Sequence, residues 1–537
     1  MQLPTDLFHW ITAFLPILVL LILMIKFRWR ATEAAPIGVF TAMLTALLVF
    51  KANGTLIATE IVRGVWSASM VIIVIWPAIL LYEVSSEAKA FDTFRSGIRR
   101  LLPNELVRVL AIGLGFVGFM IGITGFGVPV AVGAPLLIGI GVNPLYAVII
   151  SLIGESWGST FGTLAVAWDA LRLAVGLDND PAALLRAALW SGMLIWVWNL
   201  IVGLAVCWLY GRGKALKKGF PAVALVSLIQ GGGQVVMGQI NQTLACFVPT
   251  CIALMVLLML GKTKLYGSPW RIDDSPIMIR GEETEAVSGE SSGMNFLQAF
   301  APYIVLTAIT LFVLIVPAVK NFLSQWSFGF PLPETTTGYG YTTAAVAKYS
   351  PISPLTHASL FLLISAVFAI EFYISLKYLR RDRIRAVLSR SVTKIVPSGF
   401  SVIGFLIMSR IMSGSGQTSV LATGMANVLG PAYAIIAPMV GLLGAFMTSS
   451  NMASNILFSE FQMTTASILG MNTSAILGAQ TVGGAIGTAT CPGNIILGCT
   501  TAGIMGHEGD VLKKTLPLSI VSALLIGVIV FVIIVLL

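Results

Sequence analysis

The chain has 537 residues, of which 57% are hydrophobic and only 10% are charged. Soluble globular domains carry about 25% charged residues, so the composition excludes that class, and the recurring apolar runs predict a polytopic helical membrane protein. The formal net charge is +9, but the basic residues cluster in short loops between apolar runs. The positive-inside rule explains that pattern, so no nucleic-acid partner is expected.

Residue types that hold metals or cofactors are few and scattered. The chain has five cysteines and three histidines, and they form no CxxC or Cys/His cluster, so no metal, haem or disulfide framework is expected. The letters G-K-T at 261–263 are not a phosphate-binding loop, because Val256 stands where that motif requires its first glycine. No nucleotide-driven pump is therefore predicted.

The first half of the chain reads as a series of membrane spans. They are expected over 8–25, 35–50, 66–82, 106–123, 144–153, 187–210, 220–236 and 244–260. The first run has no basic region ahead of it and no small-residue cleavage site, so it is expected to be a retained helix. Basic residues follow it directly, which predicts a cytoplasmic loop and an external N-terminus.

A polar stretch with ten charged residues, 262–295, separates the two halves. It predicts three parts: an N-terminal transmembrane half (1–261), a linker loop (262–295) and a C-terminal transmembrane half (296–537). Further spans are expected over 296–316, 360–376, 396–411, 432–447, 475–504 and 516–537, with a longer external loop at 321–357. The predicted fold is all-α, with about 12–14 transmembrane helices in two related halves.

Glycines and prolines interrupt one apolar run in each half. Residues 122–135 read G-I-T-G-F-G-V-P-V-A-V-G-A-P, and 413–438 hold a similar Gly-rich stretch. Each follows a basic amphipathic segment, at 89–100 and 377–394. Broken backbone at bilayer depth is tolerated only inside protein or beside a water-filled cavity, and duplicated breaks are typical of repeat-built transporters. Broken or re-entrant hairpins are thus predicted at about 122–142 and 413–438; closely packed glycine-rich helices are the alternative.

Several motifs resemble those of the L-lactate permease family of bacterial monocarboxylate transporters. They are G-F-G-V-P-V-A at 125–131, L-L-I-G-I-G-V-N-P-L-Y-A at 136–147, A-F-M-T-S-S-N-M-A-S-N-I-L-F at 445–458 and V-G-G-A-I-G-T-A-T-C-P-G-N-I at 482–495. The resemblance implies a secondary carrier of the cell membrane that imports L-lactate, glycolate or a related 2-hydroxy acid by proton symport. The chain departs from the family pattern where Ile121 replaces an acidic residue, Asn451 an Asp and Thr488 a Lys.

Glu155 is the predicted proton-coupling residue, because an ionisable group at bilayer depth is costly and needs a reason. It lies in a neutral stretch shortly after the first break. The alternative is a structural Glu that is hydrogen-bonded to a neighbouring helix.

Backbone at the breaks and the polar side chains beside them form the predicted substrate site. The candidates are Gly125, Phe126, Gly127, Arg410, Ser450, Asn451, Ser454, Asn455, Thr488 and Asn494. Backbone N–H groups and a cation suit a carboxylate, and hydroxyls and amides suit a hydroxy acid. The alternatives are an interfacial, snorkelling role for Arg410 and interhelical hydrogen bonding for the polar residues.

Three other functions remain open from the residues alone. The first is a carrier for another small organic anion, or one coupled to Na⁺. The second is a channel, because Gly-rich re-entrant loops also build selectivity filters. A membrane enzyme is a weaker alternative, since no nucleophile and base pair or cofactor motif is visible. The sequence thus predicts a small organic anion and the bilayer as partners, and no cofactor besides the coupling ion.

Overall fold

The computed structural model describes residues 3–27, 29–91, 93, 98, 101–125, 127–280 and 293–536. Within them, twelve helical stretches are long and apolar enough to cross a membrane. Two further apolar helices are shorter: Val128–Ile138 has 11 residues and Pro144–Ser156 has 13 residues. The predicted all-α polytopic fold is confirmed, with a span count at the low end of the expected range.

The N-terminal half holds eleven described helices. They are α1 (Leu7–Leu21), α2 (Ala31–Leu48), α3 (Gly54–Glu87), α5 (Glu105–Leu110), α6 (Val117–Ile123), α7 (Val128–Ile138), α8 (Pro144–Ser156), α9 (Gly162–Val175), α10 (Pro181–Ser227), α11 (Gly233–Ile240) and α12 (Phe247–Leu260). A π-helical turn, Ala111–Phe116, joins α5 to α6. The chain of α10 reverses at Gly211 and Arg212, whose backbone angles are not helical, so that this element makes two crossings.

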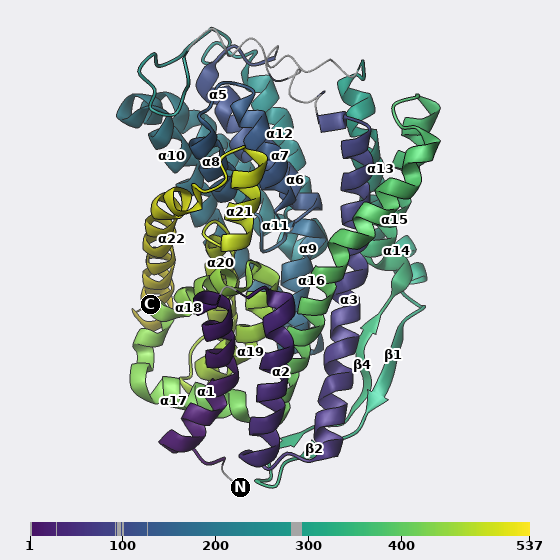
Figure 1. The fold of residues 1–537 in the computed structure, drawn as a ribbon, viewed down its shortest axis with the longest axis vertical. Helices are drawn as coiled ribbons and strands as arrows, with labels where there is room; N and C mark the ends of the chain where they lie inside the picture. Colours follow the sequence, from purple (N-terminus) through teal and green to yellow (C-terminus); the bar gives the residue numbers. More distant parts are fainter. Residues whose placement is uncertain are drawn as a thin grey trace.

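The C-terminal half adds ten helices and four short strands. They are α13 (Phe296–Ile315), α14 (Pro317–Leu323), β1 (Phe328–Leu332), β2 (Thr335–Thr336), β3 (Thr342–Thr343), β4 (Val346–Ile352), α15 (Ala358–Ser375), α16 (Ile384–Gly414), α17 (Gln417–Leu429), α18 (Tyr433–Thr448), α19 (Asn451–Ile468), α20 (Thr473–Thr488), α21 (Pro492–Thr501) and α22 (Glu508–Phe531). The strands pair antiparallel, β1 with β4 and β2 with β3. They lie in the expected external loop and pack beside the start of α3, as Figure 1 shows.

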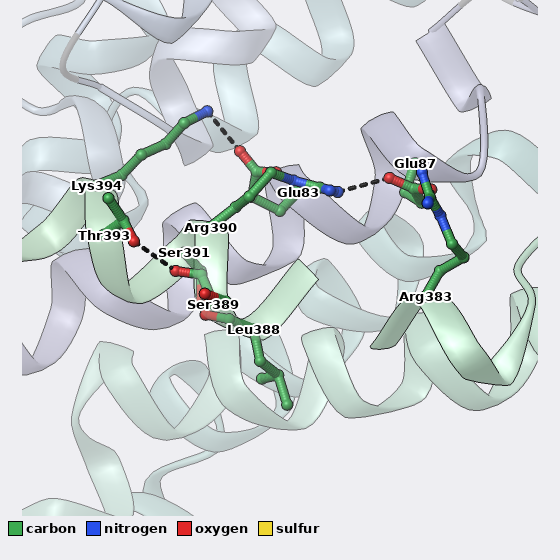
Figure 2. A network of polar contacts seen from close by, with 9 residues as sticks. All are labelled: Glu83, Glu87, Arg383, Leu388, Ser389, Arg390, Ser391, Thr393 and Lys394. Carbon is green, nitrogen blue, oxygen red and sulfur yellow. Dashed lines mark hydrogen bonds and ion pairs between the residues drawn. The ribbon is translucent and has the colours of Figure 1, made fainter. Parts of the chain in front are cut away.

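The long helices α3 and α16 pack along each other and are joined at one end by a network of ion pairs (Figure 2). Glu83 accepts from Arg390 Nε at 2.9 Å and from Lys394 Nζ at 2.5 Å. Glu87 accepts from Arg383 Nε at 2.8 Å and from Arg390 at 2.5 Å. The basic segment predicted at 377–394 is thus largely the first turns of α16, and its charges fix that helix to α3.

Each half contains a helix pair that folds back on itself. The first arm, α5 to α6, ends at Ile123, and the chain returns in the opposite direction as α7, so that Gly133 lies against Val117. In the second half α18 reverses at Ser449 and Ser450 and returns as α19, where the Ser454 hydroxyl donates to Gly441 O at 2.7 Å. The two pairs point toward each other from opposite ends of the molecule (Figure 1).

A broken helix accompanies each pair. α8 and α9 are interrupted at 157–161, and α20 and α21 at 489–491. In both halves the first part of the broken helix packs beside the first arm of the pair in the same direction, with Gly154 against Gly113 in one half and Gly483 against Pro438 in the other. The two halves therefore share one arrangement in opposite orientation.

The second hairpin differs in place from the prediction. The stretch predicted for it, 413–438, contains the end of α16, all of α17 and the start of α18, whereas the antiparallel pair turns at 449–450. Gly416 (φ 85°) and Gly430 (φ 51°) mark helix ends there, which is the ordinary role of such glycines. Most of the first basic segment, 89–100, lies outside the described residues.

The described part of the linker, 262–280, covers the end of the molecule where α5 begins and α7 ends. Glu105 N donates to Trp270 O at 3.0 Å, and Asn143 N donates to Ile277 O at 2.7 Å. Arg280 forms an ion pair with Glu105 at 2.8 Å. These contacts fix the open end of the first hairpin.

Candidate functional site

The four interruptions meet at one place inside the molecule. They surround a cavity of about 50 Å³. Its lining comes from α6, α8, α9, α19, α20 and α21 and from the turns beside them: Ile121, Gly125, Glu155, Ser159, Gly162, Thr163, Val166, Ala167, Ser449, Ser450, Asn451, Met452, Thr488 and Asn494. Residues more than 300 positions apart in the sequence thus share one site.

Helix N-termini are the main electrostatic feature of this site. Gly127, with φ 78°, caps α7, and Ser450 caps α19 by accepting from Ala453 N at 3.3 Å. Residues of the first turns of α9 and α21, Thr163 and Asn494, also line the cavity. The N-terminal end of a helix carries partial positive charge and free N–H groups, so it favours an anion.

The first half gives the cavity a strained backbone and a close helix contact. Thr163, Leu164 and Ala165 have φ of 52°, 51° and 70°, a left-handed conformation that side chains other than glycine adopt at a cost. A Cβ added at Gly125 would lie 2.5 Å from Thr163 Oγ1. Only a residue without a side chain allows this turn to approach α9 so closely.

Glu155 lies in the last turn of α8, is 3% exposed and contributes the carboxyl group of the cavity lining. The backbone N–H groups of Gly127 and Val130, at the start of α7, face this carboxyl group. Its Oε2 atom makes no hydrogen bond, and the group makes no ion pair, with any residue that the structure describes. Burial of a carboxylate without a neighbouring cation is costly, and the two N–H groups at the start of α7 offset part of that cost.

Asn451 provides an amide that is also without partners. It is 3% exposed, and neither Nδ2 nor Oδ1 makes a hydrogen bond with a described residue. The neighbouring Thr488 hydroxyl lies 3.3 Å from Ser159 Oγ and donates to Ala485 O at 2.7 Å. The site therefore combines an acid, a free amide and hydroxyls, a set that can bind a small molecule carrying a carboxylate and a hydroxyl group.

The structure brings together six of the residues named from the sequence and separates the others. Gly125, Glu155, Ser450, Asn451, Thr488 and Asn494 all line the cavity. Gly127 lies beside it, where an added Cβ would be 3.1 Å from Asn494 Oδ1. Phe126 lies outside the described residues.

Ser454 and Asn455 do not line the cavity. Both are fully buried. Ser454 bonds to α18 and accepts from Gln480 at 3.1 Å, and Asn455 donates to Ala167 O at 2.9 Å and to Thr481 at 3.0 Å. They hold α19 against α9 and α20, the interhelical role that was their alternative interpretation.

Arg410 lies away from the cavity. Its guanidinium donates to Leu173 O at 2.5 Å, near the C-terminal end of α9, and sits 5.9 Å from the Tyr349 ring. Glu60 and Glu460 are its acidic neighbours. A cation at a helix C-terminus is a stabilising arrangement, so Arg410 connects α16 to α9 and does not contact the space where substrate would bind.

Ser159 and Thr163 line the cavity although the sequence prediction did not select them. A signal was present, because Ser159 follows Glu155 by one helical turn in a stretch containing Gly158. Thr163 had no such signal, because it depends on the left-handed start of α9.

A second cavity of about 480 Å³ adjoins the first and shares Ser449, Ser450, Met452 and Asn494 with it. It extends between α2, α16 and α21 as far as Arg30. The cavity of about 480 Å³ thus lies between the small cavity and the loop that precedes α2.

Comparisons with known proteins identify the family. The family model described as L-lactate permease matches residues 9–537. The L-lactate permease of Escherichia coli (strain K12) is 27% identical over 546 residues, covering 96% of this chain and 94% of that protein. The glycolate permease GlcA of the same strain is 24% identical over 549 residues, covering 97% and 94%.

Another bacterial relative and one solved structure are also similar. The L-lactate permease of Halalkalibacterium halodurans is 24% identical over 521 residues, covering 94% of this chain and 93% of that protein. The Alcanivorax borkumensis YdaH transporter has a TM-score of 0.42 and 12% identity, over 89% of this chain and 87% of that chain. The family match over nearly the whole length, with the twelve candidate spans, shows that this chain is a multi-pass transporter of the cell membrane and belongs to the L-lactate permease family.

Proposed function

We propose that this protein imports a small 2-hydroxy monocarboxylate, L-lactate or glycolate, together with a proton. The observation that carries the proposal is Glu155, a buried acid whose Oε2 atom has no described hydrogen-bond partner, in a cavity that also holds a free amide and the first turns of α19 and α21. Relatives named for L-lactate and for glycolate support this substrate class. Both are small anions with one carboxylate and one neighbouring hydroxyl.

The substrate carboxylate would bind at the starts of α7 and α19, where backbone N–H groups and the Asn451 amide can donate to it. The hydroxyls of Ser450 and Thr488 and the amide of Asn494 are within reach of the 2-hydroxyl group. All four side chains belong to the cavity lining. The positive ends of broken helices recognise anionic substrates in other secondary transporters.

Electrostatics supports proton coupling at Glu155. A substrate carboxylate in this cavity would lie beside the carboxyl group of Glu155, and two like charges about 6 Å apart repel by about 3 kcal/mol at an effective dielectric constant of about 20. Protonation of Glu155 removes that repulsion. Substrate and proton therefore favour each other's binding, which is the thermodynamic requirement for symport.

Access to the site requires movement. The cavity of about 50 Å³ is narrow where it lies between the two hairpin turns, and the larger cavity of about 480 Å³ begins on the far side of Ser449 and Ser450. A shift of the α18–α19 hairpin would join the two spaces. Alternating access in this chain would then come from movement of the hairpins and broken helices against α3 and α16.

The test is uptake of radiolabelled L-lactate into proteoliposomes that contain the purified protein. We expect an inward proton gradient to drive accumulation that unlabelled glycolate competes with. Accumulation driven only by an inward Na⁺ gradient would replace the proton with Na⁺ in the proposal. Folded protein that accumulates no 2-hydroxy acid under either gradient would refute the proposed substrate class.

A further inference from the structure

An apolar groove of about 660 Å³ lies behind α8, on the side away from the cavity. Ile149 and Ile153 of α8 form its floor, Leu204 and Trp208 of α10 form one wall, and Leu518 of α22 forms the other. Trp208 is 46% exposed although it is apolar. The groove is therefore an open, apolar surface between α8, α10 and α22.

One end of this groove is basic. The Lys514 ammonium lines the groove and lies 5.3 Å from the Tyr146 ring centre, and the Arg212 guanidinium lies 5.1 Å from the Trp208 ring centre. Neither cation makes an ion pair within the described part of the chain. The next residue, Lys513, is paired with Asp510 at 3.3 Å. Two cations thus remain uncompensated where the apolar groove meets the basic turn of α10.

We propose that this groove binds an anionic phospholipid, with an acyl chain along α8 and the phosphate group between Lys514 and Arg212. The apolar length and the basic end together match a lipid with a net negative headgroup. Basic pockets between membrane helices recognise such headgroups through the charge that zwitterionic lipids lack. The aromatic rings under both cations fit the headgroup level of a bilayer, where Trp and Tyr concentrate.

The position of the groove gives the bound lipid a connection to the transport site. Ile153 is two residues before Glu155 on α8, so that the acyl chain would pack on the back of the helix that carries the proton-coupling residue. Removal of the lipid would leave this surface of α8 less supported. The proposal does not depend on which substrate or ion is carried.

Binding is measured on the full chain in non-ionic detergent, by native mass spectrometry and by the shift in melting temperature. The two probes are dioleoyl phosphatidylglycerol and dioleoyl phosphatidylcholine, which have the same acyl chains. We expect the wild type to prefer phosphatidylglycerol. The double variant Lys514→Gln/Arg212→Gln should lose about 25-fold in that affinity, about fivefold for each interfacial cation, and bind phosphatidylcholine as before.

Two further variants make the test specific. Ala205→Trp, which fills the groove and keeps both cations, should weaken binding of both lipids. Lys262→Gln, an exposed basic residue outside the groove, should leave both affinities unchanged. Wild-type phosphatidylglycerol preference in the double variant, or undiminished binding in Ala205→Trp, would overturn the proposal. Lys514→Arg should bind like the wild type, which separates loss of charge from loss of folding.

Discussion

Glu155→Gln replaces the carboxyl group of the cavity with a neutral amide of the same length. Glutamine resembles the protonated form of the acid, so the variant should bind substrate at every pH and should carry it without a proton. Its position against the N–H groups of Gly127 and Val130 allows the amide oxygen to replace a carboxylate oxygen. We therefore expect the variant to fold normally.

The size of the effect follows from the cavity. A substrate carboxylate held about 6 Å from a charged Glu155 is repelled by about 3 kcal/mol at an effective dielectric constant of about 20. That energy corresponds to about 100-fold in affinity. Wild-type protein should therefore bind L-lactate about 100-fold more weakly once the pH is high enough to deprotonate Glu155. In Glu155→Gln the affinity should stay close to its low-pH value.

Equilibrium binding of labelled L-lactate across pH, together with two transport modes, provides the assay. The variant should still exchange internal for external L-lactate and should fail to accumulate it under a proton gradient. Glu371→Gln, on the exposed face of α15, is the matched control and should behave like the wild type. Proton-driven accumulation in Glu155→Gln, or a retained fall in its affinity at high pH, would refute the reasoning.

Three further substitutions separate substrate contacts from structural contacts. Asn451→Ala should raise the KM for L-lactate by 10-fold or more, because a hydrogen bond to a charged group contributes about 1.5–3 kcal/mol. The melting temperature should stay near the wild-type value. An unchanged KM would show that Asn451 does not bind the substrate. Gly125→Ala places a methyl group against Thr163 and should lower the stability by about 1–3 kcal/mol, as measured by thermal unfolding. The double variant Gly125→Ala/Thr163→Gly should regain the lost stability. If it does not, the contact between these two residues is contradicted. Arg410→Ala should lower the stability by about 2 kcal/mol, because its hydrogen bond to Leu173 O is lost. The KM for uptake should be unchanged. A raised KM at wild-type stability would instead show that Arg410 contributes to substrate binding.

The turn between α6 and α7 lies within the Gly-rich stretch that the sequence singled out, because that turn uses glycine for a physical reason. Gly127 has a left-handed backbone, and Gly125 allows close contact with α9. The second hairpin could not be located in the same way. Its turn is made by Ser449, with φ 55°, and Ser450, whereas Gly416 and Gly430 mark the ends of ordinary helices.

Some residues of the candidate site could be predicted from the sequence, and others could not. Glu155 and Asn451 were selected because polar groups in an apolar run need a reason, and both line the cavity. Arg410 met the same criterion but is placed at the end of α9. The sequence alone shows that burying a charged group is costly. Only the tertiary structure shows which partner offsets that cost.

By itself, the sequence determined that this protein is a polytopic helical membrane protein with interrupted helices, because hydropathy and Gly/Pro content are local properties. It also provided the motifs by which the family was identified. Only the tertiary structure decided that four interruptions meet at one cavity, since α6 to α9 and α18 to α21 are hundreds of residues apart. The opposite orientation of the two hairpins was likewise decided by packing, because the direction of a helix in the fold is set by its neighbours and is not encoded in its own composition.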